Sequence, residues 1–142
     1  MKGTLALVLA VAAAGIVVTS GSATATKQSG ALHVTKECSQ YDGSAGSYCT
    51  LTSSNVPAIE PGMKVVYLAV PANGVLFSKI VLSSGQGGAA FGRVLLGLGS
   101  AMGFVSLSAG TGRFAGFHAH AVVSLDSNGV WHWDGTYSFT KR

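Results

Sequence analysis

The chain has 142 residues and a net charge of +4 at neutral pH, with 48% hydrophobic and only 10% charged residues. Residues 26–142 suffice for one ordinary domain and are too few for two. The cations are scattered, and only the last two residues are neighbouring cations. No basic stripe exists that could neutralise successive phosphates, which excludes a nucleic-acid partner.

A secretory signal peptide is predicted at residues 1–25. Lys2 is followed by an apolar run at 5–18, by small and polar residues, and by an A-x-A cleavage sequence at 23–25. An uncleaved anchor is the alternative, but the run is shorter than the ~20 residues that span a bilayer. We therefore predict a secreted, extracytoplasmic protein that starts at Thr26 and has no stable membrane anchor after cleavage.

The two cysteines, Cys38 and Cys49, both lie in the exported part of the chain. An even number of cysteines in an exported protein indicates a disulfide, here across a loop rich in turn-forming residues. A redox or metal role is the alternative, and a metal site would need further ligands at suitable spacing. We expect a structural disulfide, no metal and no cofactor.

Short β-branched and aromatic runs, separated by turns, follow along the chain and are typical of an all-β protein. The expected strands are 31–37, 47–53, 63–70, 75–83, 88–96, 101–109, 113–125 and 130–140. Eight strands with short connections predict a closed antiparallel β-barrel, because closure removes exposed sheet edges. A two-sheet sandwich is the structural alternative.

Arg93 stands out because the strand around it is otherwise apolar. Inside a barrel it would need a carboxylate, for which Glu60 is the candidate, and it would orient an anionic guest. An outward, solvated Arg93 is the alternative, since arginine is rarely buried unpaired. Further along, Gly110-Thr111-Gly112 lacks the lysine of a phosphate-binding loop and leads into a strand, so a turn is expected there.

The last two strands form the clearest hairpin. Apolar side chains alternate in 115–125 and in 131–139. Matching the two apolar faces fixes the pairing, because a slip of one residue would exchange the faces. The predicted partners are Leu125 with Trp131, Val123 with Trp133, Ala119 with Tyr137, and Phe117 with Phe139. Residues 127–129 then form a three-residue loop, with Gly129 in the left-handed conformation.

The opposite face of this hairpin carries His118, His120, His132 and Asp134 among hydroxyl side chains. We expect a solvent-facing surface. A pH-responsive or binding role and a metal site are the alternatives, although two imidazoles and a distant carboxylate are a poor ligand set.

The apolar face places small residues, Ala119 and Ala121, beside large aromatic ones. Either the alanines make room for the rings in a filled core, or they leave space for a guest. Ligand pockets are typically apolar with a few polar groups. The candidate ligand-binding residues are therefore Phe117, Trp131, Trp133, Tyr137, Phe139 and Arg93.

Segments punctuated by glycine carry a family resemblance. The sequence resembles the allene oxide cyclase-like barrels, which are related in shape to dirigent proteins. The resemblance is carried by residues 110–117 and 131–139, together with the stretch from 91–93 to 103–105. The resemblance spans roughly residues 45–140. It implies an eight-stranded barrel with a hydrophobic cavity, in a family of cofactor-free cyclases, isomerases and proteins that steer reactive small molecules. No characterised catalytic set aligns with this sequence.

Three functions follow as hypotheses. The first is binding of a small hydrophobic or aromatic molecule inside the barrel, without catalysis. The second is a cofactor-free cyclase or isomerase, or a dirigent-type steering protein, with Arg93, Glu60 or Tyr67 in the cavity. The third is a structural or adhesive exported protein with a filled core. No serine hydrolase or glycosidase motif is present, and export favours binding because a secreted cyclase would meet a diluted substrate.

Overall fold

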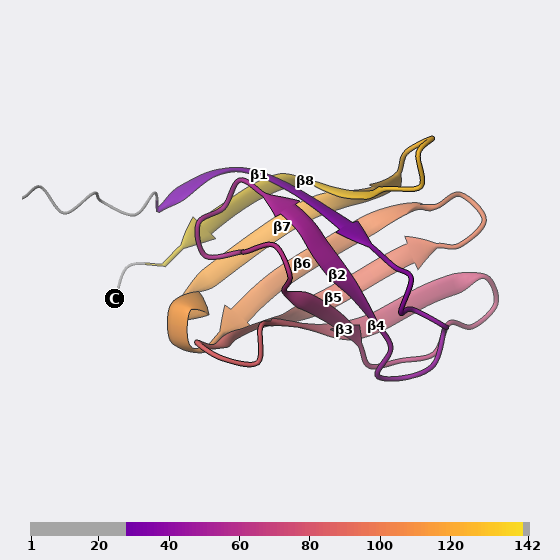
Figure 1. The fold of residues 1–142 in the computed structure, drawn as a ribbon, viewed down its shortest axis with the longest axis horizontal. Helices are drawn as coiled ribbons and strands as arrows, with labels where there is room; N and C mark the ends of the chain where they lie inside the picture. Colours follow the sequence, from indigo (N-terminus) through magenta and orange to yellow (C-terminus); the bar gives the residue numbers. More distant parts are fainter. Residues whose placement is uncertain (1–27, 141–142) are drawn as a thin grey trace, which may run out of the picture.

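Eight antiparallel strands close into a barrel in the computed structural model, which describes residues 28–140 (Figure 1). Each strand pairs with the next one in the chain, and the first pairs with the last. The strands are β1 (Ser29–Glu37), β2 (Tyr48–Ser54), β3 (Lys64–Tyr67), β4 (Val75–Ser83), β5 (Ala89–Gly97), β6 (Met102–Gly110), β7 (Phe117–Leu125) and β8 (Trp131–Phe139). The predicted closed antiparallel barrel is confirmed; the predicted signal at 1–25 lies outside the described residues.

β3 and β7 are each four residues shorter than predicted, each for a local reason. β3 ends at Tyr67 because the N–H groups of Leu68 and Ala69 both donate to the hydroxyl of Ser78, 3.0 Å away. β7 begins only at Phe117, because a single 3₁₀ turn, η1 (Gly112–Phe114), precedes it. Positive φ angles at Gly112, the first residue of this turn, and at Gly116, just after it, interrupt the extended backbone.

The final hairpin has the predicted register. All four predicted residue pairs face each other between β7 and β8. Asp126 and Val130 hydrogen-bond across the loop at 127–129, and Gly129 has a φ of 78°. The predicted disulfide is also present and joins Cys38, just after β1, to Cys49 in β2.

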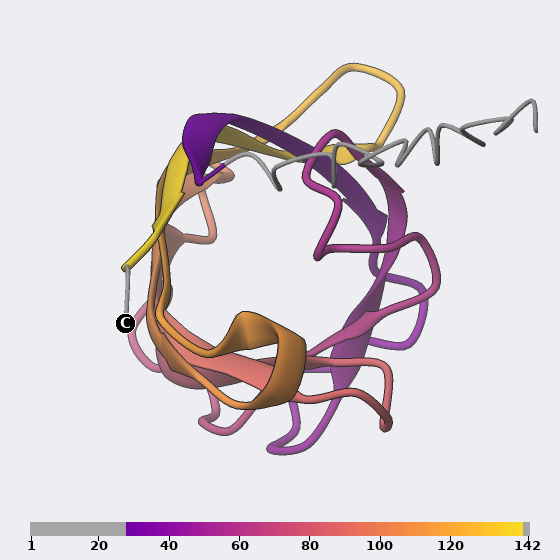
Figure 2. The same cartoon turned by 90° about the vertical axis from the view of Figure 1, so that its left-hand side faces the viewer.

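The core lies in the barrel interior, and buried side chains alternate with more exposed ones along the strands. Figure 2 shows the closed ring of strands end-on, with the turn η1 at the end that faces the viewer. We call the end that carries η1 the aromatic end. It holds the rings of Phe114, Phe117, Tyr137 and Phe139, whose centroids lie 5.0–6.3 Å apart in contacting pairs. We call the opposite end, where the β1–β2, β3–β4, β5–β6 and β7–β8 connections lie, the lysine end. Within residues 28–140, no helix is long and apolar enough to cross a membrane.

Candidate functional site

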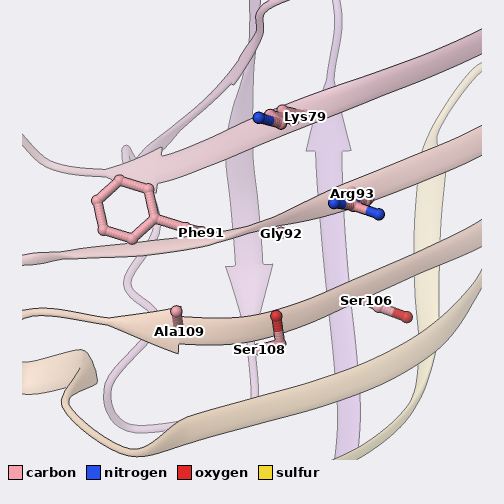
Figure 3. A pocket seen from close by; sticks show the side chains of 7 residues that line it. All are labelled: Lys79, Phe91, Gly92, Arg93, Ser106, Ser108 and Ala109. Atoms are coloured by element: carbon pink, nitrogen blue, oxygen red, sulfur yellow. The ribbon is translucent and has the colours of Figure 1, made fainter.

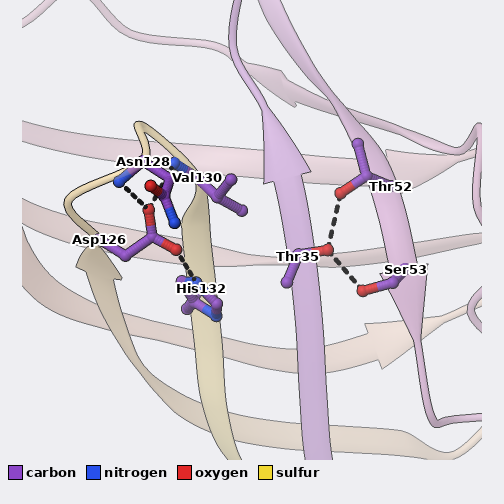
Figure 4. Close-up of polar contacts among 7 residues, drawn as sticks. All are labelled: Thr35, Thr52, Ser53, Asp126, Asn128, Val130 and His132. Atoms are coloured by element: carbon purple, nitrogen blue, oxygen red, sulfur yellow. Dashed lines mark hydrogen bonds and ion pairs between the residues drawn. The ribbon is translucent and has the colours of Figure 1, made fainter.

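A lysine side chain points into the barrel at the lysine end. In β1, Lys36 continues the inward alternation of Leu32 and Val34, and it is only 3% exposed. A β-bulge in β2 determines which residue lies opposite Lys36. Thr52 and Ser53 both hydrogen-bond to the hydroxyl of Thr35 (Figure 4). The register shifts after Thr35, so the buried Leu51 lies opposite Lys36.

The amine of Lys36 is surrounded by aromatic rings. Its Nζ atom is hydrogen-bonded to the phenolic oxygen of Tyr67. The same atom lies 5.2 Å from the ring centroid of Tyr67, 5.4 Å from that of Trp131 and 5.6 Å from that of Trp133. The sulfurs of Cys38 and Cys49 lie 3.9 and 3.8 Å away. The strand pairing and the disulfide therefore bring residues from β1, β2, β3 and β8 to one nitrogen.

Burial makes this amine less basic. Removal from water lowers the pKa of Lys36 from its ordinary value to about 7. The three rings favour the ammonium form and act against this effect, but none of the side chains that line the site is a carboxylate. Burial also raises the pKa of Tyr67, so its phenol stays protonated. Near neutral pH the site holds a lysine that is often uncharged, next to a phenol.

A pocket of about 60 Å³ lies in front of this amine. Its lining is mostly apolar and consists of Lys36, Cys38, Tyr41, Cys49, Tyr67, Leu76, Leu96, Leu98 and Trp131. Leu98 is 43% exposed, so the pocket reaches the surface at the β5–β6 turn. An apolar cavity with a few polar groups at one point is the usual composition of a small-molecule site.

Two further polar groups beside the amine lack hydrogen-bond partners. The hydroxyl of Tyr41 and the indole N–H of Trp133 are buried without a partner. Tyr41 packs edge-on against Tyr67 with centroids 5.1 Å apart, and the ring of Trp133 is near Nζ. Buried donors are normally paired, and an unpaired one costs about 1–3 kcal/mol. Tyr41 lines the pocket together with Lys36, so its hydroxyl and the amine offer donors to a guest that carries an acceptor; Trp133 is not one of the lining residues.

The predicted ligand-binding residues divide between three places. Trp131 and Trp133 lie beside Lys36 at the lysine end. Phe117, Tyr137 and Phe139 pack against one another at the aromatic end, which they fill. Arg93 lies on the outer face of β5 and not in the interior, because the neighbouring Val94 takes the inward position.

The outer face around Arg93 has a shallow groove over β4, β5 and β6 (Figure 3). Arg93 lies opposite Lys79 on the neighbouring strand. Gly92, which has no side chain, also lines the groove. Glu60, the candidate partner of Arg93, instead contacts Arg113 at 3.2 Å. Arg93 and Lys79 are both exposed to solvent. Arg93 therefore has neither the carboxylate partner nor the interior position that its predicted role in orienting a guest requires.

The histidines lie on the outer surface, as expected for a solvent-facing strand face. His118 contacts Thr140, His120 contacts Ser106, and His132 contacts Asp126 at 2.7 Å (Figure 4). The hydrogen bond from His132, together with those from loop backbone N–H groups, lowers the pKa of Asp126. Among the described residues, no three His, Cys, Asp or Glu side chains gather around a point that would hold a metal ion.

Sequence reasoning missed the central residue of the site. Strand 31–37 was predicted, and the alternation of Leu32, Val34 and Lys36 was the signal that would have placed the lysine inside. Charged residues are almost never fully buried unless they are paired, so the pattern alone does not single out this lysine as an interior residue. Tyr41 comes from the β1–β2 loop, for which periodicity gives no direction.

Comparisons with known proteins add little. No family model and no curated protein sequence matches the chain. One solved structure, described as that of the pterocarpan synthase dirigent protein PsPTS1, is similar with a TM-score of 0.43 and 12% identity, over 82% of this chain and 99% of that one. So distant a likeness carries no argument about activity, and the barrel fold rests on the strand pairing itself.

Proposed function

We propose that the protein binds a small apolar molecule with an oxygen acceptor in the pocket at the lysine end. The observation that carries this proposal is the pocket itself, an apolar space of about 60 Å³ that opens beside Leu98 and ends at a buried amine. Tyr41, whose buried hydroxyl lacks a partner, also lines the pocket, and the lining residues include no carboxylate. A carbonyl or hydroxyl oxygen would satisfy these donors, and its carbon chain would contact the leucines.

The size of the pocket limits the guest. An apolar cavity that holds benzene has a volume of roughly 150 Å³. The pocket is less than half that size, so it accepts the polar end of a molecule and a few carbons, while a longer chain would pass Leu98 toward solvent. The disulfide is compatible with an oxidising compartment, and export therefore remains part of the proposal.

The test uses the fluorescence of the two tryptophans, Trp131 and Trp133, which both face the amine. The oxidised protein is titrated with straight-chain alcohols and ketones of increasing length. We expect a saturable change in emission, which Leu98→Phe weakens by at least fivefold because the larger side chain narrows the opening.

The matched control is Leu95→Phe, because Leu95 lies in β5 only three residues before Leu98 but on the outer face, 49% exposed. This variant should bind as the wild type does. The proposal fails when no compound in the series gives a saturable change, or when Leu98→Phe binds as tightly as Leu95→Phe.

A cyclase or isomerase is the second candidate, and one observation favours it. That hypothesis needs a polar residue with a shifted pKa inside the cavity, and Tyr67 is such a residue, 3% exposed and hydrogen-bonded to Lys36. Arg93 and Glu60, the other two residues considered for this role, are exposed. Catalysis would therefore depend on the pair of Tyr67 and Lys36.

A further inference from the structure

The amine of Lys36 has the geometry of a nucleophile that faces a binding pocket. Lys36 lines an apolar pocket, and its Nζ atom is hydrogen-bonded to the phenol of Tyr67 and makes longer contacts to the two disulfide sulfurs. The titratable groups that face it from neighbouring segments are the phenols of Tyr67 in β3 and Tyr41 in the β1–β2 loop; the tryptophans of β8 and the disulfide carry no charge.

An uncharged amine is the nucleophilic form of lysine. With a pKa of about 7, roughly half of the Lys36 side chains are neutral at pH 7. A lysine with the ordinary pKa of about 10.4 is neutral in fewer than about one molecule in a thousand at this pH. Desolvated lysines in apolar pockets commonly react with carbonyl compounds for this reason.

We infer that Lys36 forms a reversible imine with a small apolar aldehyde that enters the lysine-end pocket. The inference rests on the proposed function, because the aldehyde must first occupy the pocket. An aldehyde fits better than a ketone, since its carbonyl carbon carries one hydrogen in place of a second carbon branch, and the pocket has little room beside Nζ.

The reaction balances without an oxidant or a reductant. The lone pair of Nζ forms a bond to the carbonyl carbon, and the C=O π electrons move to the oxygen. The oxygen gains a proton and Nζ loses one, which gives a carbinolamine. A second proton reaches the hydroxyl, the C–O bond breaks, and water leaves as the C=N bond forms. The nitrogen then loses its remaining proton, so the products are one imine and one water.

Tyr67 is the group placed to move protons in this sequence. Its hydroxyl is hydrogen-bonded to Nζ, and it is protonated across the neutral pH range because burial raises its pKa. It can donate to the carbinolamine oxygen and recover a proton from the nitrogen. Tyr41 packs against Tyr67 and lines the same pocket, so its unpaired hydroxyl offers a further hydrogen-bond donor for the guest.

The experiment traps the imine in the oxidised protein. The protein is incubated at pH 7 with propanal or pentanal and sodium cyanoborohydride, which reduces imines, and modified lysines are located by peptide mass spectrometry. We expect Lys36 to be alkylated at least tenfold faster than Lys79, an exposed lysine of the outer face in the same sample. The comparison within one sample does not depend on the folding of any variant.

Two variants sharpen the result. Lys36→Met keeps an unbranched side chain in the interior and should remove the fast reaction while the slow labelling of Lys79 continues. Tyr67→Phe should slow labelling of Lys36 by more than tenfold at pH 7 and change its pH profile, since it removes the phenol that transfers protons.

The outcomes separate this inference from the proposed function. Saturable binding of an alcohol without faster labelling of Lys36 overturns the imine and leaves the binding site intact. Failure of alcohols, ketones and aldehydes alike to bind overturns both. Tighter binding of the matching carboxylic acid, with no trapped adduct, would show that Lys36 acts as an ammonium partner for an anion, and this also overturns the imine.

Discussion

The two ends of the barrel solve the same packing problem in different ways. At the aromatic end, four rings from η1, β7 and β8 contact one another and fill the interior, and Phe114 and Phe117 are fully buried. At the lysine end, two tryptophans and a tyrosine surround an amine and leave a pocket of about 60 Å³. Aromatic residues are therefore used at one end as core and at the other as the walls of a site.

This difference indicates where stability and function lie. Filling the interior with apolar rings stabilises the fold, whereas burying an amine without a carboxylate works against folding. The disulfide between Cys38 and Cys49 lies at the lysine end, where a covalent link across a short loop contributes about 3 kcal/mol in the chain-entropy picture. The lysine end therefore contains both the buried amine of Lys36, which opposes folding, and the disulfide, which stabilises the fold.

Phe117→Ala should have the largest effect, because it opens a cavity at the aromatic end. Phe117 is fully buried and contacts the rings of Phe114, Tyr137 and Phe139. We expect the free energy of unfolding to fall by about 3–5 kcal/mol. Denaturant unfolding followed by circular dichroism measures this loss.

The control for that variant is Phe77→Ala, since Phe77 is 63% exposed on the outer face. Its removal should change the free energy of unfolding by less than about 0.5 kcal/mol. A loss below about 1 kcal/mol for Phe117→Ala would show that the aromatic end is not the packed core described above.

Lys36→Met should stabilise the protein, and the gain should depend on pH. The folded-state pKa of about 7 lies below the unfolded value of 10.5. Between these values the unfolded chain binds a proton that the folded chain does not. The wild type therefore gains stability as the pH rises from 7 to 10.5, with a slope of at most about 1.4 kcal/mol per pH unit, and this contribution is constant outside that range.

The variant lacks this titration, so its advantage over the wild type should be largest at pH 7 and below and should shrink toward pH 10. Unfolding free energies of both proteins, measured at several pH values from 6 to 10, give the difference. Parallel curves for the two proteins would mean that Lys36 keeps an ordinary pKa in the fold, and the distinction between the two ends would lose its electrostatic basis.

Sequence patterns predicted the fold better than they predicted the site. Alternation and turn residues fixed the register of the β7–β8 hairpin, since a slip would have exposed Trp133 and buried His132. The alternation in β1 continues through Lys36 and places it inward, which conflicts with the usual cost of burying a charge. The lowered pKa resolves this conflict, and it arises only when distant strands enclose the amine. Arg93 shows the opposite case, a lone cation in an apolar strand that does face solvent.

Gly129→Ala should have the smallest effect, and it tests how much the loops of the lysine end matter. Gly129 has a φ of 78°, a conformation that L side chains rarely adopt, although a Cβ there would meet no atom within 4 Å. We expect a loss of about 1 kcal/mol from backbone strain alone.

Gly99→Ala, in the β5–β6 turn at the same end, is the matched control, because its Cβ would also have open space and its φ is not in the left-handed region. It should lose less than about 0.5 kcal/mol or gain slightly, since alanine restricts the unfolded chain. Equal losses in the two variants, measured by denaturant unfolding, would mean that the left-handed backbone at Gly129 adds no strain for alanine.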